Sequence, residues 1–523
     1  MNKFSLLAAA IAVAVAAAGQ AAAQDGSANH GKIMGCYFGS WAFYRPGLGK
    51  FDVPDIDPTL CTHGFYGFAD IDENTYEIRV WDPWYDLGPQ DCGAGECNYD
   101  SYRRFVALKQ RNPDFKPMIS VGGWTAGSKE FSEMARDPGL RAVFIDSVVA
   151  FLQKFGFEGL DFDWEYPGFF DGSDEENDRD NFSALIRELA ERLHPLGYLL
   201  SSAMSPGYEK IPTCYDLPEL NKHFDFVNVM TYDYHGYWKD REEWDHREFT
   251  GHNAPMISTD SEMAAGPSHP GYMYNVFDSV NLYIDGGIDA SKIVLGMPLY
   301  GRGWELVDPT NNGIYCPTDA GVPWGPYTQQ VGIWGYEEVL QAQYNTTMND
   351  QMPEATPGGW QIVVDSCYQA PYMTNGPYWV SYDDPDSLTL KAQFANHMGL
   401  AGAFVWSVDT DDFHADNSPE LFPLMRAINR ALASGLTYTP SHPCVGSAPM
   451  CEISTPAMDC QSDGQRLPHP TDCHKYYECS DPDGDGLMAV EEHDCGDWFF
   501  DPALNTCVDP ERPGNEGLCP EEA

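Results

Sequence analysis

The chain of 523 residues is too long for one ordinary domain, and its composition, 43% hydrophobic with 13% aromatic residues, is typical of globular proteins. Its 79 acidic and 30 basic residues give a formal net charge of −49. This charge argues against nucleic acid and anionic membranes as partners, because both attract basic surfaces. A neutral polymer would feel little of this field.

The first segment has the features of a secretion signal. A positive start precedes an apolar run over 4–18 and the small residues Ala21–Ala23, so residues 1–23 are predicted to be a signal peptide. No later segment has the roughly 18 uninterrupted apolar residues of a membrane span. We therefore expect a secreted, extracellular protein whose 15 cysteines mostly form disulfides. Asn181 and Asn345 begin glycosylation sequons, which matter if the host is eukaryotic.

Strand-like runs alternate with helical stretches over residues 30–433. The eight runs are Ile33–Phe38, Cys61–Asp70, Lys116–Gly123, Gly156–Trp164, Tyr198–Ser205, Phe224–Tyr232, Lys292–Gly301 and Leu400–Asp409. Helical spacing of apolar residues is clearest in Pro138–Phe155, and Asn177–Leu193 and Ser387–His397 are also helical in character. Eight strands alternating with helices predict an α/β fold, a (β/α)8 TIM barrel.

The alternation breaks within 303–376, where Pro, Gly and aromatic residues dominate around one helical stretch at Tyr336–Tyr344. We interpret this region as an α+β insertion between the seventh and eighth strands. A linker rich in Pro, Ser and Thr follows over 434–458. Residues 459–520 then form a small cysteine-rich segment, predicted to be a disulfide-stabilised β module.

The stretch Phe157–Pro167 reads FEGLDFDWEYP and is the most informative in the chain. Acids and large apolar residues alternate in it: Asp161, Asp163 and Glu165 with Leu160, Phe162 and Trp164. Period-two alternation predicts a strand with all three acids on one face and the apolar residues packed outward against helices. Burial of carboxylates is costly and is found where chemistry needs shifted proton affinities.

This stretch resembles the D-G-x-D-x-D-x-E signature of family-18 glycoside hydrolases, the chitinase family, although Glu158 stands where the family usually has Asp. Other motifs follow in the family's order: SVGG at 120–123, MTYDYHG at 230–236, GMPLYGRGW at 296–304 and FVWSVDTDDF at 404–413. The resemblance covers about residues 33–430 and makes the barrel the expected catalytic domain.

Glycoside cleavage needs a proton donor beside the leaving oxygen, and Glu165, nearest the end of its strand, is predicted to be that general acid and then the base. The resemblance implies substrate-assisted, retaining hydrolysis, in which the sugar's own N-acetyl oxygen attacks. Asp163 would then orient the acetamido N–H and Tyr232 would bond its carbonyl oxygen, while Asp161 lies deeper and could share a proton with Asp163. The alternatives from the residues alone are a solvated strand face or a metal cluster. No His pattern suggests zinc, and we expect no metal and no cofactor.

Aromatic side chains stack on the apolar faces of sugar rings. Six aromatic residues near the strand ends match cleft-lining positions of the family: Tyr37, Trp41, Phe68, Trp124, Trp238 and Trp406. Four further residues match its substrate-binding positions: Met230, Asp233, Tyr300 and Arg302. Trp406 is the expected floor under the cleaved sugar.

The last six cysteines resemble those of a peritrophin-A type chitin-binding domain across about 458–520. The resemblance implies the pairs Cys460–Cys479, Cys473–Cys519 and Cys495–Cys507, whereas sequence alone allows 15 connectivities. Its candidate chitin contacts are Tyr476, Tyr477, Trp498 and Phe499. A competing signal is Asp481–Glu492, which fits a calcium-loop template but lacks flanking helices.

Cysteine pairings elsewhere follow from the same resemblance or remain open. In the barrel, Cys36 with Cys61 and Cys316 with Cys367 match family pairs. Local loops are possible between Cys92 and Cys97 and between Cys444 and Cys451, and Cys214 is left over.

Together these features predict a secreted, monomeric chitinase that acts on chitin and chitooligosaccharides. The alternative from a different class is a non-catalytic chitin-binding lectin or matrix protein on the same barrel. Glu165 discriminates between them, since non-catalytic relatives typically lose that acid.

Overall fold

The computed structural model describes residues 26–92, 97–170, 172–238, 249–344 and 359–438, and the backbone of five short strands between Arg466 and Val508. The chain divides into two compact units, Met1–Cys451 and Glu452–Ala523. Several predictions lie outside the described residues: the signal peptide 1–23, most of the linker 434–458, the side chains of the module 459–520, the calcium-type loop and the sequon at Asn345.

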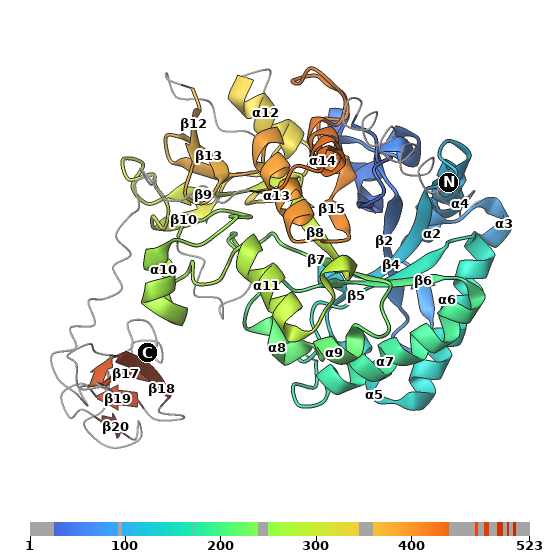
Figure 1. The fold of residues 1–523 in the computed structure, drawn as a ribbon, viewed down its shortest axis with the longest axis horizontal. Coiled ribbons are helices and arrows are strands. Elements are labelled where there is room, and N and C mark those ends of the chain that lie inside the picture. The colour runs from blue at the N-terminus through green and yellow to red at the C-terminus, as the bar shows by residue number, and fades with distance from the viewer. Residues whose placement is uncertain are drawn as a thin grey trace, which may run out of the picture. The chain divides into compact units, whose positions relative to one another are not determined.

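Eight parallel strands close into a barrel (Figure 1), as the alternation predicted. They are β1 (Ile33–Gly39), β2 (His63–Ile71), β4 (Lys116–Gly122), β5 (Gly159–Asp163), β6 (Leu199–Met204), β7 (Phe226–Val229), β8 (Ile293–Pro298) and β15 (Gly402–Trp406). Each strand pairs with its neighbour, and β1 closes the ring by pairing with both β15 and β2. A short strand, β3 (Ile78–Val80), extends β2 antiparallel.

Helices surround the barrel, and most of them cover its outside (Figure 1). They are α2 (Pro83–Asp86), α3 (Pro89–Cys92), α4 (Ser101–Val106), α5 (Lys129–Arg136), α6 (Pro138–Phe155), α7 (Asp178–Leu193), α8 (Lys210–Cys214), α9 (Leu217–Leu220), α10 (Asp260–Ala265), α11 (Val276–Gly286), α13 (Pro385–His397) and α14 (Pro423–Ser434). Helix α6 shows why the sequence folds locally in this way. The Asp137 side chain accepts from the first free backbone N–H groups, Pro138 opens the helix, and Gly156 ends it in the left-handed conformation.

The outward face of β5 joins the barrel to these helices. The Phe162 ring lies 5.4 Å from that of Phe131, on α5, and 6.0 Å from that of Phe182, on α7. Trp164 packs against the same two rings. The predicted division of this strand into an apolar outer face and an acidic inner face is therefore what the structure has.

An antiparallel sheet is inserted between β8 and β15, which confirms the predicted insertion. Its strands are β9 (Tyr300–Leu306), β10 (Thr318–Gly321), β11 (Ile333–Gly335), β12 (Gln361–Asp365), β13 (Ala370–Asn375) and β14 (Tyr378–Ser381), with helix α12 (Tyr336–Tyr344). The sheet starts three residues before the expected 303–376, because the run predicted as one strand breaks at Leu299, and it ends five residues after it. Trp304 and Trp379 fill its core, with rings 5.4 Å apart.

The second unit contains two small antiparallel sheets. Strands β16 (Arg466–Pro468), β17 (Lys475–Ser480) and β18 (Ala489–Asp494) form one, and β19 (Phe499–Asp501) and β20 (Thr506–Val508) form the other. Strands β17 and β18 pair antiparallel along their whole length.

Cysteines of the barrel unit behave largely as expected. Disulfides join Cys36 to Cys61 and Cys92 to Cys97. Cys316 is disulfide-bonded, and its pairing with Cys367 stays a prediction. Cys214 is a buried free thiol. Among the described residues, no helix has the length and apolarity needed to cross a bilayer.

Candidate active site

Asp161 lies at the centre of the barrel and is completely buried. Four side chains donate hydrogen bonds to its two oxygens: Tyr37 (2.7 Å) and Ser120 (2.7 Å) to Oδ2, and Ser201 (2.7 Å) and Asn228 (3.2 Å) to Oδ1. Burial raises the pKa of Asp161, and these four donors oppose that shift. The donor set suits a carboxylate and holds it in one orientation.

Strand register explains how these donors meet. Ser120 on β4 and Ser201 on β6 are the direct neighbours of Asp161 across the parallel ladders on either side of β5. Sequence reasoning did not identify Ser120, Ser201 or Asn228 as site residues. The available signal was their placement, since inward-facing small polar residues on adjacent predicted strands stand opposite a buried acid.

Asp163, two residues further along the same face, is buried like Asp161 but lacks its full set of hydrogen bonds. Its side chain is buried and its Oδ1 has no hydrogen-bond partner. Burial, together with the nearby charges of Glu165 and Asp161, raises the pKa of Asp163 well above its usual value. A proton in this cluster therefore resides more readily on Asp163 than on the fully bonded Asp161.

Glycines of the SVGG motif allow β4 to approach Asp163 closely. A Cβ on Gly122 would lie 2.0 Å from the carbonyl oxygen of Asp163, and Gly122 has a positive φ of 119°. The Gly123 N–H donates to the same carbonyl at 2.9 Å. Glu165 follows the end of β5 rather than lying within it, and is half-buried.

A second carboxylate, Asp233, lies on the wall beside the barrel mouth. Arg302 donates to both its oxygens, Nε at 2.8 Å and Nη2 at 2.6 Å, and the Tyr300 hydroxyl donates to it as well. Arg302 is nearly buried, and its guanidinium lies 5.4 Å from the centre of the Trp238 ring. The four predicted residues of the loop after β7 and of strand β9 thus form one cluster: Asp233, Trp238, Tyr300 and Arg302.

Tyr232 lies between this cluster, the wall of the cleft, and the acids on the inner face of β5, which form its floor. Its ring is buried, with its centre 6.1 Å from that of Tyr300 and 6.0 Å from that of Phe404. Burial raises the pKa of Tyr232 well above its usual value, and the nearby Tyr300, Asp163, Asp233 and Glu165 add to this shift. Met230, two residues earlier, is also buried.

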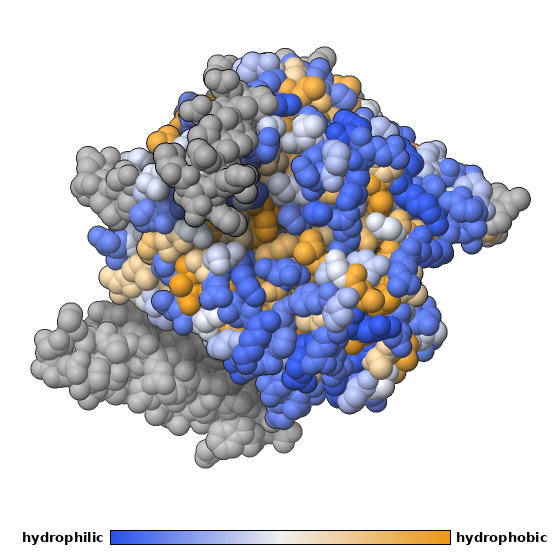
Figure 2. Space-filling view, turned by 45° about the vertical axis from the view of Figure 1, so that its right-hand side comes forward, coloured by the Kyte–Doolittle hydropathy of each residue, from blue (hydrophilic) through white to orange (hydrophobic). Residues whose placement is uncertain are grey.

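Aromatic rings form a row over the barrel mouth. Phe68 and Trp406 stack with centres 5.9 Å apart, and Trp41, 42% exposed, stacks on Phe68 at 6.0 Å. Tyr37 lies beneath Trp406 and is buried, so it holds Asp161 and supports the row rather than offering its own face. Trp124, 38% exposed, packs edge-on against Phe170, with ring centres 5.4 Å apart. Figure 2 shows a largely hydrophilic face with apolar residues gathered in a hollow near its centre.

Glu158, which departs from the family signature, lies just before β5, at the opposite end of the strand from Glu165. It forms ion pairs with Lys109 and, at 3.2 Å, with Lys116. The substitution therefore concerns surface charge at the far end of the barrel. In the ranges that the structure describes, no three His, Cys, Asp or Glu side chains are grouped as a metal site.

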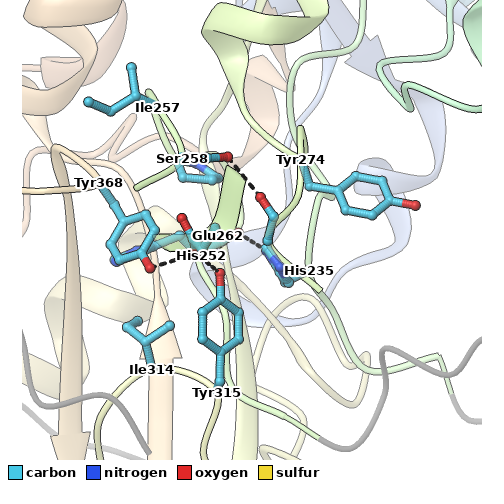
Figure 3. Close-up of a pocket in the computed structure, with 11 residues that line it drawn as sticks. His235, His252, Ile257, Ser258, Glu262, Tyr274, Ile314, Tyr315 and Tyr368 are labelled. Carbon is cyan, nitrogen blue, oxygen red and sulfur yellow. Dashed lines mark hydrogen bonds between the residues drawn. The ribbon is translucent and has the colours of Figure 1, made fainter. Parts of the chain in front are cut away.

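A separate narrow hollow, with no room for a water molecule, lies behind the wall (Figure 3). The buried carboxylate of Glu262 faces it and accepts hydrogen bonds from the hydroxyls of Tyr315 and, at 2.7 Å, of Tyr368. His235 and His252 line the same hollow. Because Glu262 bonds to the two tyrosines and His235 bonds to backbone carbonyls, the hollow is part of the packing that supports the wall.

Two family models match the chain. Residues 33–411 match the model of Glycosyl hydrolases family 18, and residues 460–514 match that of the Chitin binding Peritrophin-A domain. Probable chitinase 10 of Drosophila melanogaster is 35% identical over 411 residues, which are 77% of this chain but 16% of that protein.

Solved structures give the same picture. The Group IV chitinase of Ostrinia furnacalis in complex with allosamidin is 37% identical, with a TM-score of 0.69, covering 78% of this chain and 100% of that one. Human YKL-39, described as a pseudo-chitinase with retained chitooligosaccharide binding, is 31% identical, with a TM-score of 0.65, covering 77% of this chain and 99% of that one.

Proposed function

Because the chain belongs to family 18 of the glycosyl hydrolases and carries a C-terminal peritrophin-A chitin-binding domain, we propose that it is a secreted chitinase. It hydrolyses β-1,4 bonds between N-acetylglucosamine units of chitin. The observation that carries the proposal is Glu165 at the end of β5, beside the buried and incompletely bonded Asp163.

Glu165 donates its proton to the leaving glycosidic oxygen as the bond to C1 breaks. The carbonyl oxygen of the substrate's own N-acetyl group attacks C1 and forms an oxazolinium-like intermediate. Glu165 then removes a proton from water, which opens this ring at C1 and restores the original anomeric configuration. Two displacements at one carbon give net retention.

Asp163 accepts the acetamido N–H and Tyr232 donates to the acetamido carbonyl oxygen, so both orient the internal nucleophile. Burial and two neighbouring acids favour the protonated form of Asp163. A positive charge developing on the acetamido group favours its ionised form, because opposite charges attract strongly in a site sheltered from water. Asp161, fixed by four donors, keeps the pair aligned from below.

The aromatic row suits a neutral polysaccharide chain better than a charged ligand. Stacking on Trp406 and Trp41 buries carbon-bound hydrogens and needs no cation. Tyr44 and Trp84 form a second exposed aromatic pair, with ring centres 6.0 Å apart. The chitin-binding module would raise the local concentration of the cleft at an insoluble surface.

The second candidate is a chitin-binding lectin without activity, which the similarity to a pseudo-chitinase favours. The presence of Glu165 favours the enzyme. Neither function needs a metal or a second copy of the chain, so the active form is proposed to be a monomer with no cofactor.

Turnover of a fluorogenic chitobioside by the full-length protein, with release of soluble oligosaccharides from chitin, tests the proposal. Glu165→Gln keeps the size and hydrogen-bonding groups of the side chain but cannot donate its proton. Release by the natural protein and none by the variant is the expected result. If neither protein releases product while both bind chitin, the lectin is the correct function.

A further inference from the structure

One buried segment behind the wall, Thr250–Asn253, has no part in the chemistry described so far. All four of its residues are buried, and it passes between the loop after β7 and the inserted sheet. A Cβ on Gly251 would lie 2.4 Å from the His235 ring, so this contact requires glycine. His235 in turn hydrogen-bonds the carbonyl oxygen of His252 at 2.9 Å (Figure 3).

Asn253 makes four hydrogen bonds that join three parts of the molecule. Its Oδ1 accepts from the Asp233 N–H at 2.9 Å and its Nδ2 donates to the Tyr300 carbonyl at 3.2 Å. Its backbone accepts from the Tyr234 N–H at 3.0 Å and donates to the Ser381 hydroxyl at 2.8 Å. A single amide therefore fixes the backbones of two residues whose side chains also bond to each other.

The Asp233 backbone needs such support. Its φ of 59° lies in the left-handed region, which costs a residue with a side chain about 1 kcal/mol or more. Asn253 binds the N–H of this residue, so it stabilises the conformation that points the Asp233 carboxylate at Tyr300 and Arg302.

We propose that Asn253 is a positioning residue for the cleft wall: it holds Asp233 in its left-handed conformation and sets its distance from Tyr300. This inference rests on the proposed function in one respect, that Asp233 and its neighbours contact the sugar chain. The amide is required because one side chain must accept from an N–H and donate to a carbonyl at once. An ionised carboxylate cannot donate to the carbonyl, and an apolar side chain can neither accept nor donate.

The matched control lies three residues away. Thr250 is equally buried, and its hydroxyl also bonds two backbone groups, the Gly313 carbonyl at 2.8 Å and the Cys316 N–H at 3.0 Å, with no hydrogen bond to Asp233. Asn253→Leu and Thr250→Val each remove two such bonds while keeping side-chain volume. Comparable losses of thermal stability are therefore expected from both.

Their effects on activity should differ. We expect Asn253→Leu to lower kcat/KM on chitooligosaccharides about 10- to 100-fold, since displacement of a positioned group by about 1 Å has effects of this size. Thr250→Val should stay within about twofold of the natural protein. In an Asp233→Ala background, Asn253→Leu should cost no more than about threefold further, because its target is already gone.

Asn253→Asp gives a pH signature and guards against misfolding of the leucine variant. A protonated carboxyl accepts from Asp233 and donates to Tyr300 as the amide does, whereas the ionised form repels the Tyr300 carbonyl. The activity of this variant relative to the natural protein should rise as pH falls. Equal losses of kcat/KM in Asn253→Leu and Thr250→Val would overturn the proposal. So would a loss of kcat/KM from Asn253→Leu that is undiminished in the Asp233→Ala background.

A crystal structure of Asn253→Leu separates this inference from the proposed function. Departure of Asp233 from its left-handed conformation supports the positioning role even if the natural protein proves inactive. An unchanged Asp233 backbone refutes it even if the natural protein is a chitinase.

Discussion

The floor and the wall of the cleft each present an aspartate, and the two differ in what surrounds them. Asp163 on the floor is 4% exposed, lies between two other acids, and has an oxygen without a hydrogen-bond partner. The side chain of Asp233 on the wall is 35% exposed and receives Arg302 in a two-pronged ion pair. The surroundings of Asp163 thus favour its protonated form, whereas those of Asp233 fix a charge in one place.

The largest loss of activity should come from substitution of Asp163. Asp163→Asn keeps shape but removes the charge that develops opposite the oxazolinium-like centre, so we expect kcat to fall about 100- to 1000-fold. KM should change little, since stacking on the aromatic row is unaffected. Steady-state kinetics on a fluorogenic chitobioside measure both constants, and a KM effect larger than the kcat effect would contradict the assigned role.

An intermediate effect is expected at the wall. Arg302→Lys keeps the charge but loses the planar, two-pronged contact with Asp233. We expect KM for chitooligosaccharides to rise about tenfold with kcat changed less than about threefold, as for a group that binds ground and transition states alike. A fall in kcat as large as that of Asp163→Asn would erase the distinction between the two regions.

Support of the floor can be tested at Asp161. Ser201→Ala removes one of its four donors, and we expect a loss of about 1–2 kcal/mol in the free energy of unfolding, measured with urea. Activity should fall only a few-fold, because three donors remain. Unchanged stability would mean that the hydrogen bond contributes nothing to the folded state.

Glu337 on α12 is a buried acid away from the cleft, and its pKa is raised to about 8 by burial and by the nearby charges of Asp412 and Asp416. The folded state therefore keeps a proton that the unfolded chain releases near pH 4.5, so its stability falls between about pH 4.5 and 8. Glu337→Gln should remove this slope, which raises the melting temperature relative to the natural protein at pH 8 and leaves a smaller difference below pH 4. A constant difference across this range would show that the residue does not titrate as described.

Much of the fold could be predicted from the sequence because its signals are local. Period-two alternation placed the acids of β5 on the inner face, and the eight apolar runs correspond to the eight barrel strands. The break at Leu299 was not predicted, since the run continues in composition while the chain passes from barrel to inserted sheet.

The site was only partly predictable. Alternation and family motifs identified the acids and the aromatic row, but not the side chains that hold them. Ser120 and Ser201 depend on register between strands far apart in sequence. Asn253 depends on a loop crossing behind the wall, and no periodicity reports such a contact.

The anomeric form of the first product tests the central claim most directly. Time-resolved NMR of a chitooligosaccharide treated with the natural protein should show the β-anomer first, from retention through the acetamido group, and Glu165→Gln should give no product. Initial release of the α-anomer, or cleavage by Glu165→Gln at the natural rate, would contradict the account.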